Sequence, residues 1–113
     1  MADKKLRFET RQIHSGYHID QTGSRGVAIY PTAAYHFRDC DHAARLFELS
    51  EGGNIYTRLQ NPTNDTVAAQ IAAMEGGVAA MLTSSGQAAN FFACFNICQA
   101  GDHMITTNSI YGG

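Results

Sequence analysis

Residues 78–107 constrain the fold of this chain more than any other stretch. Two short apolar runs, VAAML and HMITT, flank a longer segment, GQAANFFACFNICQAG, that is rich in small and apolar residues. Short apolar runs of this kind are typical of buried strands, and the segment between them is typical of a helix that ends at Gly101. The stretch therefore predicts one βαβ unit with two parallel strands and a right-handed crossover.

A single βαβ unit does not complete a domain. Its parallel sheet would be uncovered on its faces and unpaired at its edges. The sequence has 113 residues, of which 44% are hydrophobic, so it can form one small domain and hardly two. It also stops at Gly113, in the turn NSIYGG that follows the second apolar run. We therefore expect residues 41–113 to be the first part of a larger α/β domain.

The first forty residues differ from the rest in composition. The stretch SGYHIDQTGSRGVAIYPTAAYHF is rich in Gly, Ser, Thr and Tyr and has no sustained periodicity. Residues 1–40 are therefore predicted to form an irregular arm that packs on another element. The next segment, DHAARLFELSEGG, predicts a short helix that is capped by Asp39 or Asp41, presents Leu46 and Leu49 on one face and ends at the Gly-Gly pair.

A second helix is predicted from the stretch NPTNDTVAAQIAAMEGG. Pro62 favours extended geometry at Asn61 and can open the helix. Val67, Ile71 and Met74 then follow at helical spacing, and the Gly-Gly pair stops the helix.

The charge and cysteine content narrow the functional classes. The formal net charge is -2 and the eight basic residues spread up to Arg58 without forming a patch, which argues against a nucleic-acid or membrane-surface role. The N-terminus mixes both charge signs, unlike a signal peptide, and the apolar stretch at residues 90–98 is too short to span a bilayer. Three cysteines are an odd number without a secreted framework, so we expect a cytoplasmic, reduced protein.

The histidines and cysteines do not form a recognisable metal motif. His14 and His18 are four residues apart, and His36, Cys40 and His42 are clustered, but neither group lies in a convincing helix with a third ligand. No CxxC, HExxH, Walker or GxGxxG pattern is present. The sequence therefore predicts no metal site.

The segment Ser84-Ser85-Gly86-Gln87 is a candidate anion site. It lies where the first apolar run enters the predicted helix, so free backbone N–H groups and the positive end of the helix dipole would meet at one point. Gly86 would let the backbone approach a ligand closely. An ordinary serine cap with nothing bound explains the same residues equally well.

Three further residues could join such a site. Tyr56 and Arg58 are two apart in IYTRLQNPT, so in an extended segment both side chains would point the same way and offer a phosphate a compact set of donors. Tyr111 follows the second apolar run, where ligands of open α/β sheets gather, and its ring could stack on a flat ligand. The alternatives are an exposed arginine beside a packed tyrosine, and ordinary loop packing of Tyr111.

Together these stretches resemble the N-terminal part of the Cys/Met-metabolism family of pyridoxal-5'-phosphate (PLP) enzymes. The resemblance runs from TRQIHSGY through HAARLFELSEGGNIYTRLQNPTNDT and AAMEGGVAAMLTSSGQAA to GDHMITTNSIYGG. It implies an N-terminal arm followed by the start of the large PLP-binding α/β domain of a fold-type I (aspartate aminotransferase-like) enzyme. Relatives commonly have Met in place of Gln87, but the family uses the backbone N–H at that position.

The resemblance implies a role for each matched residue. Gly86 and Gln87 would bind the PLP phosphate through their N–H groups, and Tyr111 would stack on the pyridine ring and take part in proton transfer. Tyr56 and Arg58 would reach the phosphate of the PLP that a neighbouring subunit holds. The catalytic unit would then be a homodimer, paired into a tetramer, with the residue 1–40 arm packed on neighbouring subunits.

The implied reaction is γ-replacement on O-acetyl-L-homoserine, in which sulfide or a thiol displaces acetate; with sulfide the product is L-homocysteine, on the route to methionine. γ-Elimination from methionine and cystathionine synthesis or cleavage are alternatives within the family. A truncated chain that only binds a partner and a small nucleotide-binding module are alternatives of another class. PLP chemistry needs a Schiff-base lysine, and the sequence has only Lys4 and Lys5, in a charged tail. We therefore expect the 113-residue chain alone to be inactive.

Overall fold

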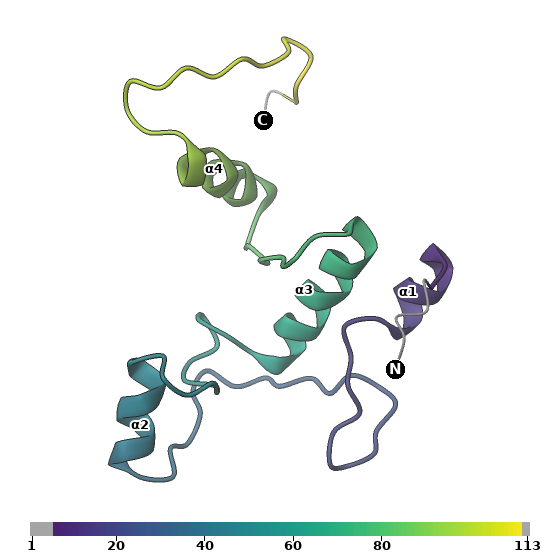
Figure 1. Cartoon of the computed structure of the whole chain (residues 1–113), viewed down its shortest axis with the longest axis vertical. Coiled ribbons are helices and arrows are strands. Elements are labelled where there is room, and N and C mark those ends of the chain that lie inside the picture. The colour runs from purple at the N-terminus through teal and green to yellow at the C-terminus, as the bar shows by residue number, and fades with distance from the viewer. Residues whose placement is uncertain (1–5, 112–113) are drawn as a thin grey trace. The chain divides into compact units, whose positions relative to one another are not determined.

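The computed structural model describes residues 6–111 and divides into two compact units, one ending at Met81 and the other beginning at Leu82. The described residues form four helices, which are labelled in Figure 1: α1 (Phe8–His14), α2 (Cys40–Phe47), α3 (Pro62–Glu75) and α4 (Gly86–Ile97). The first unit contains α1, α2 and α3, and the second contains α4 and the loop after it. None of the helices in the described part has the length and apolar character that crossing a bilayer requires.

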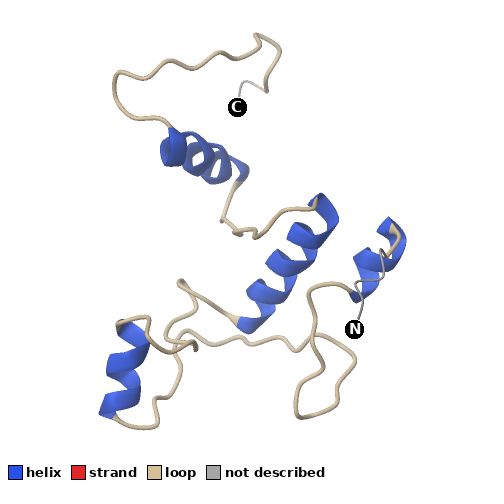
Figure 2. Ribbon diagram, viewed as in Figure 1, coloured by secondary structure: helices blue, strands red, loops and turns tan. Residues whose placement is uncertain are grey.

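Neither predicted strand forms within residues 6–111, so the predicted βαβ unit is not present there. Residues 78–82 and 103–107 are loop, and Figure 2 shows helices and loops without a strand. Within the described residues, β pairing is limited to an isolated antiparallel bridge between Ala34 and Tyr56. A strand exists only where its backbone N–H and C=O groups pair with a neighbour, and no described segment pairs with either run. Val78 and Ile105 are accordingly exposed, although their sequence context is typical of a buried strand.

The beginning of α2 follows the sequence prediction. Asp39 is the N-cap, and its carboxylate accepts a hydrogen bond from the backbone N–H of His42 at 2.6 Å. This hydrogen bond is the main cause that lowers the pKa of Asp39. Leu46, on the inner face of α2, is only 2% exposed and is the most deeply buried apolar side chain of the described residues.

The end of α2 comes earlier than the predicted Gly-Gly pair. The helix ends at Phe47, because the backbone N–H groups of Ser50 and Glu51 both donate to the carbonyl of Arg45, at 3.0 and 3.3 Å. Leu49 lies in this turn with a left-handed φ of 58° and is exposed. The prediction that Leu49 lies on one helix face with Leu46 is therefore wrong, since the helix ends before Leu49.

The α3 helix has the predicted bounds. Asn61 is its extended N-cap (φ -150°, ψ 131°), Pro62 is its first residue, and Gly76 ends it in the left-handed conformation (φ 70°). Its buried residue is Ala72, whereas Val67 and Ile71 stay partly exposed. The predicted helix is therefore confirmed, but the apolar side chains that its spacing brings to one face are not covered within the first unit.

The predicted irregular arm contains a short helix, α1, which lies beside α3 in Figure 1. The guanidinium of Arg11 donates to the carbonyl of Ala73 at 3.1 Å. Gly16 brings the chain against α3 with a φ of 79°, and a Cβ at this position would lie 2.5 Å from the backbone N of Gln70 and 2.7 Å from the carbonyl O of Thr66. Only glycine fits this approach. Packing on the neighbouring helix thus orders a segment that has no periodic pattern of its own.

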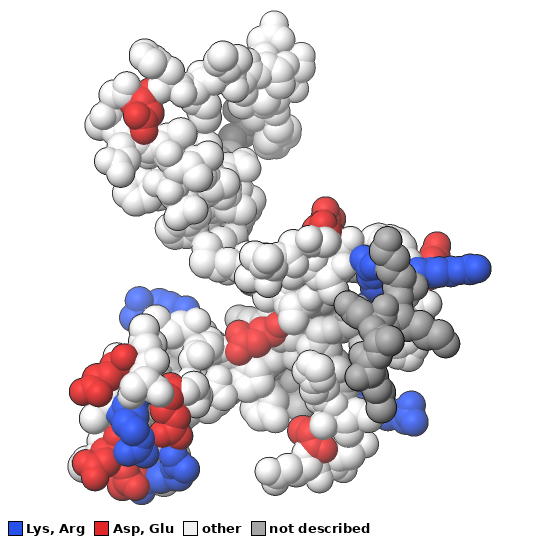
Figure 3. Space-filling model, viewed as in Figure 1, with Lys and Arg blue, Asp and Glu red and all other residues white. Residues whose placement is uncertain are grey.

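Charged side chains gather around α2, whereas the second unit is nearly free of them (Figure 3). Arg38 and Arg45 both pair with Glu51, at 2.6 and 2.8 Å, and the hydrogen bond from Arg45 lowers the pKa of Glu51. From Leu82 onward the sequence contains one charged residue, Asp102, and no Lys or Arg. The second unit therefore has no cationic Lys or Arg side chain of its own to offer an anion.

The α4 helix ends at Ile97, before the predicted stop at Gly101. Cys98 is extended (φ -117°, ψ 137°), and a turn follows in which the N–H of Asp102 donates to the carbonyl of Gln99 at 3.0 Å. Phe91 and Phe95 of α4 stack on each other, with ring centroids 5.2 Å apart, but both remain exposed.

Candidate functional site

The start of α4 presents two free backbone donors. Ser85 is the N-cap, and its hydroxyl accepts from the N–H of Ala88 at 3.1 Å, while its carbonyl accepts from Ala89 at 3.1 Å. The N–H groups of Gly86 and Gln87 have no acceptor among residues 6–111, and both residues are exposed. A serine cap and an anion site are therefore compatible here, because the cap leaves the first two amides of the helix free.

The space in front of Gly86 is open. A Cβ built on Gly86 would meet no heavy atom of the described chain within 4 Å. The two free amides lie in the first turn of α4, at the positive end of its dipole. The phosphate of a cofactor suits these donors, since it offers several strong acceptor oxygens and negative charge.

Tyr56 and Arg58 lie together in the first unit, although not in the predicted geometry. Residues 57–59 form a turn, in which the N–H groups of Leu59 and Gln60 donate to the carbonyl of Tyr56 at 2.8 and 3.1 Å. The prediction of an extended segment is wrong from Thr57 onward. The turn nevertheless places the guanidinium carbon of Arg58 5.7 Å from the centroid of the Tyr56 ring. A guanidinium stacked on a ring keeps its in-plane N–H donors available.

The Tyr56–Arg58 pair forms one wall of an open groove of about 540 Å³. The guanidinium of Arg58 has no carboxylate or other acceptor within the described part of the chain. The groove therefore holds one unpaired guanidinium, that of Arg58, and is lined by no Asp or Glu, which favours an anionic ligand. Its lining residues are Tyr30, Pro31, Thr32, Ala33, Tyr56, Thr57 and Arg58.

The two walls of this groove are tied together by Asn61. This side chain is 3% exposed, and its Nδ2 donates to the carbonyl of Tyr30 at 3.0 Å and to the hydroxyl of Thr57 at 3.1 Å. Its Oδ1 accepts from the N–H of Thr63 at 2.9 Å, and this bond caps α3. We call Asn61, Thr57 and Thr63 the Asn61 clasp.

Thr57 and Thr63 extend the clasp along the arm. The hydroxyl of Thr63 donates to the carbonyl of Ala28 at 2.9 Å and accepts from the N–H of Tyr30 at 3.0 Å. The N–H of Thr57 donates to the carbonyl of Ala33 at 2.9 Å, and its hydroxyl donates to the carbonyl of Thr32. Residues 28–33 of the predicted arm are thus held on the first unit, and any further contact of the arm with neighbouring subunits stays a prediction.

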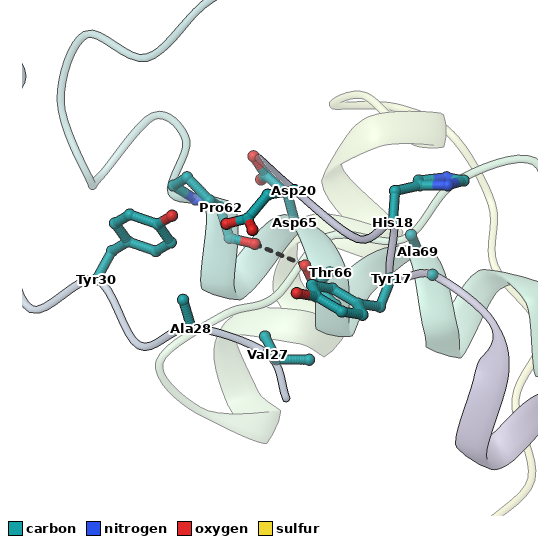
Figure 4. A pocket seen from close by; sticks show the side chains of 11 residues that line it. Tyr17, His18, Asp20, Val27, Ala28, Tyr30, Pro62, Asp65, Thr66 and Ala69 are labelled. Atoms are coloured by element: carbon teal, nitrogen blue, oxygen red, sulfur yellow. Dashed lines mark hydrogen bonds between the residues drawn. The ribbon is translucent and has the colours of Figure 1, made fainter. Parts of the chain in front are cut away.

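A second cavity, of about 370 Å³, lies against α3 and suits an anion poorly (Figure 4). Asp20 and Asp65 bring carboxylates to it and no Lys or Arg lines it. Hydrogen bonds from Thr22, chiefly from its side chain, lower the pKa of Asp20, so this carboxylate stays charged. The cavity is lined by Gly16, Tyr17, His18, Asp20, Val27, Ala28, Tyr30, Pro62, Asp65, Thr66 and Ala69.

Tyr111 is 92% exposed at the end of the described residues. It belongs to the second unit together with Gly86 and Gln87, whereas Tyr56 and Arg58 belong to the first. Its predicted roles in ring stacking and proton transfer stay predictions. For metals, residues 6–111 contain no group of three or more His, Cys, Asp or Glu side chains that could hold an ion.

The sequence interpretation missed Tyr30 and Asn61. Tyr30 lines the same groove as Tyr56, but it lies 26 residues earlier in the sequence, within the stretch predicted to be irregular. Asn61 enters the prediction of the second helix only as the residue before Pro62. The available signal was its favoured position as an N-cap, which does not indicate that the same amide also donates to two other segments.

The similarities to known proteins agree on one family. The model of the family described as Cys/Met metabolism PLP-dependent enzyme matches residues 9–113. O-acetyl-L-homoserine sulfhydrylase 1 of Thermus thermophilus is 51% identical over 109 residues, which cover 96% of this chain and 26% of the relative. Homocysteine synthase of Schizosaccharomyces pombe is 51% identical over 114 residues, which cover 100% of this chain and 27% of the relative.

A solved structure agrees with these relatives. It comes from Campylobacter jejuni, is designated an O-acetylhomoserine (thiol)-lyase and contains N'-pyridoxyl-lysine-5'-monophosphate. It matches this chain with a TM-score of 0.80 at 42% identity, covering 87% of this chain and 24% of its own. The chain thus spans about a quarter of the length of these relatives. The chain belongs to the family of Cys/Met metabolism PLP-dependent enzymes.

Proposed function

We propose that this sequence is the N-terminal, phosphate-binding part of a PLP-dependent O-acetylhomoserine sulfhydrylase. The full protein would convert O-acetyl-L-homoserine and sulfide, or a thiol, to L-homocysteine or its thioether and acetate, in methionine biosynthesis. The observation that carries this proposal is the 51% identity over 96% of the chain to the sulfhydrylase of Thermus thermophilus. The two free amides at the start of α4 support it, because they offer an anion site where the family holds its cofactor phosphate.

The charge distribution supports a phosphate site built from two parts. A phosphate monoester carries a charge of about -2 near neutral pH, and the second unit has no Lys or Arg to balance it. Gly86 and Gln87 would bind the phosphate oxygens through their amides, while Arg58 and the phenol of Tyr56 would supply the missing cation and a further donor. We assign Tyr56 and Arg58 to the PLP of a neighbouring subunit, so the active unit is a homodimer and two dimers pair into a tetramer.

The fold-type I architecture is part of the same proposal. Val78 and Ile105 lie in the two apolar runs and are exposed in the described chain. Burying a side chain of this size stabilises a protein by about 1.5–3 kcal/mol. In the full protein, further strands and helices would pair with residues 78–82 and 103–107 and cover them, so that both runs become strands of the large PLP-binding domain.

The chemistry would be divided between the cofactor and this chain. PLP, when bound, supplies the electron-withdrawing ring that permits bond breaking at the substrate carbons. Tyr111 would stack on that ring and move a proton through its phenol during loss of acetate. The lysine that carries PLP is assigned to a part of the protein outside these residues, since Lys4 and Lys5 lie in a charged stretch unlike the family's lysine loop. The free thiols Cys40, Cys94 and Cys98 suit a reduced cytoplasm.

Turnover by the full-length protein tests the proposal. With PLP present, acetate release from O-acetyl-L-homoserine should require sulfide and should match homocysteine formation mole for mole, with negligible breakdown of methionine. The chain 1–113 alone should release no acetate above the buffer control. Sulfide-independent release of ammonia from methionine by the full-length protein would contradict the sulfhydrylase assignment. Turnover by chain 1–113 alone would contradict the assignment of the lysine to another part of the protein.

A further inference from the structure

We propose that Asn61 is a positioning residue for phosphate binding by Tyr56 and Arg58, because its buried side chain fixes the groove in which they lie. This inference rests on the proposed function, since it takes the ligand of Arg58 to be the cofactor phosphate. Asn61 itself is 3% exposed and does not line the groove, so it would act through the residues that it holds.

The position of Thr57 carries the argument. Thr57 lies between Tyr56 and Arg58 in the sequence, so whatever fixes Thr57 limits both neighbours. Its hydroxyl accepts from Asn61 Nδ2 at 3.1 Å and donates to the carbonyl of Thr32, which is on the opposite wall. The same Nδ2 holds the carbonyl of Tyr30, also on that wall, at 3.0 Å. One amide group therefore joins both walls of the groove.

The energetic role of the clasp is preorganisation. Arg58 and Tyr56 are exposed side chains in a turn, and ordering such side chains when a ligand binds costs free energy. A groove whose walls are already joined by a buried amide loses less freedom on binding. Removing the donor would also leave the carbonyl of Tyr30 without this partner, which favours rearrangement of the wall.

Asparagine is the residue type that can make all three bonds. Its planar amide combines two N–H donors with an acceptor oxygen. Aspartate would keep the acceptor that caps α3 but would lose both donors to Tyr30 and Thr57. Serine is an equally favoured and uncharged cap, but it is too short to make these bonds. Both substitutions therefore keep a cap for α3 while removing the hydrogen bonds that join the walls of the groove.

The test compares cofactors with and without a phosphate in the full-length protein. Dissociation constants for PLP and for pyridoxal, which lacks the phosphate, are measured for the wild type, Asn61→Ser, Asn61→Asp and the control Asn64→Ser. Asn64 is exposed on α3 and makes no side-chain hydrogen bond within residues 6–111, so its substitution matches the chemical change without touching the clasp.

We expect Asn61→Ser to raise the dissociation constant for PLP about tenfold, which is the size expected when one or two side chains must be newly ordered on binding. The constant for pyridoxal should change less than about twofold, because pyridoxal has no phosphate for Arg58 to bind. Asn61→Asp should weaken PLP binding at least as much, and Asn64→Ser should not. In an Arg58→Ala background, Asn61→Ser should add little, because the residue through which it acts is gone.

Equal losses for PLP and pyridoxal, or losses from Asn61→Ser and Arg58→Ala that simply add, would overturn the inference and leave Asn61 with a structural role. If Asn61→Ser fails to fold, Thr57→Val serves instead, since it removes the hydroxyl of the clasp and keeps the side-chain shape, with the same selective loss expected. A wild-type protein that binds PLP no better than pyridoxal would contradict the proposed function itself.

Discussion

Replacing Gly86 with proline should weaken PLP binding by the full-length protein about 10- to 100-fold, the loss expected for one hydrogen bond to a charged group. Gly86 is the first residue of α4, and its N–H has no acceptor in the described chain, so this N–H is free for the phosphate. Proline lacks that N–H but is well tolerated at the first position of a helix. Ser85 before it is already extended (φ -160°, ψ 158°), as a residue before proline prefers.

Gly86→Ala is the matched control for this prediction. It keeps the N–H, and the added Cβ points into open space in the described chain. Its PLP dissociation constant should therefore stay within about threefold of the wild type, well below the loss of a charged hydrogen bond. Thermal unfolding monitors whether either variant loses structure. Proline and alanine variants that bind PLP equally well would contradict the role of the Gly86 amide.

Arg58→Ala should raise the dissociation constant for PLP by about 10- to 100-fold and leave that for pyridoxal nearly unchanged, because a guanidinium binds phosphate through charge-assisted hydrogen bonds. Arg58→Lys should recover part of the affinity, since lysine restores the charge but not the planar fork. Arg25, an exposed arginine outside the groove, provides the control substitution Arg25→Ala. Equal losses for Arg58→Ala and Arg25→Ala would mean that general positive charge, and not the groove, binds the phosphate.

The features that the sequence predicted well are local. Asp39 and Ser85, two of the predicted cap candidates, are the observed N-caps of α2 and α4, because a cap depends only on the next three residues. The Gly76 stop depends on one left-handed residue. In each of these interactions the partners are only a few residues apart, so the sequence around them is enough to predict them.

The features that the sequence predicted poorly depend on distant segments. The runs at 78–82 and 103–107 need paired neighbours to become strands, and within the described residues they have none. The α1 helix was missed because it is held by contacts such as that of Arg11 with Ala73, which is 62 residues away.

The same distinction applies to the candidate site. Tyr56 and Arg58 do lie together, but the chain forms a turn there and not the expected extended segment, and their binding of a phosphate stays a prediction. The burial of Asn61 and its bond to Tyr30, 31 residues earlier, could not be read from its neighbours in the sequence. The free amides of Gly86 and Gln87 were predictable because a helix start always leaves such groups.

A subunit-mixing measurement tests the central claim, a phosphate site shared between neighbouring subunits, most directly. Full-length Arg58→Ala and Gly86→Pro subunits are co-expressed, and the tight PLP-binding sites of the mixture are titrated. In a mixed dimer one site receives an intact Gly86 from one subunit and an intact Arg58 from the other. Random pairing therefore predicts wild-type affinity at about a quarter of the sites. A mixture that titrates only as the sum of the two weak variants would contradict the account.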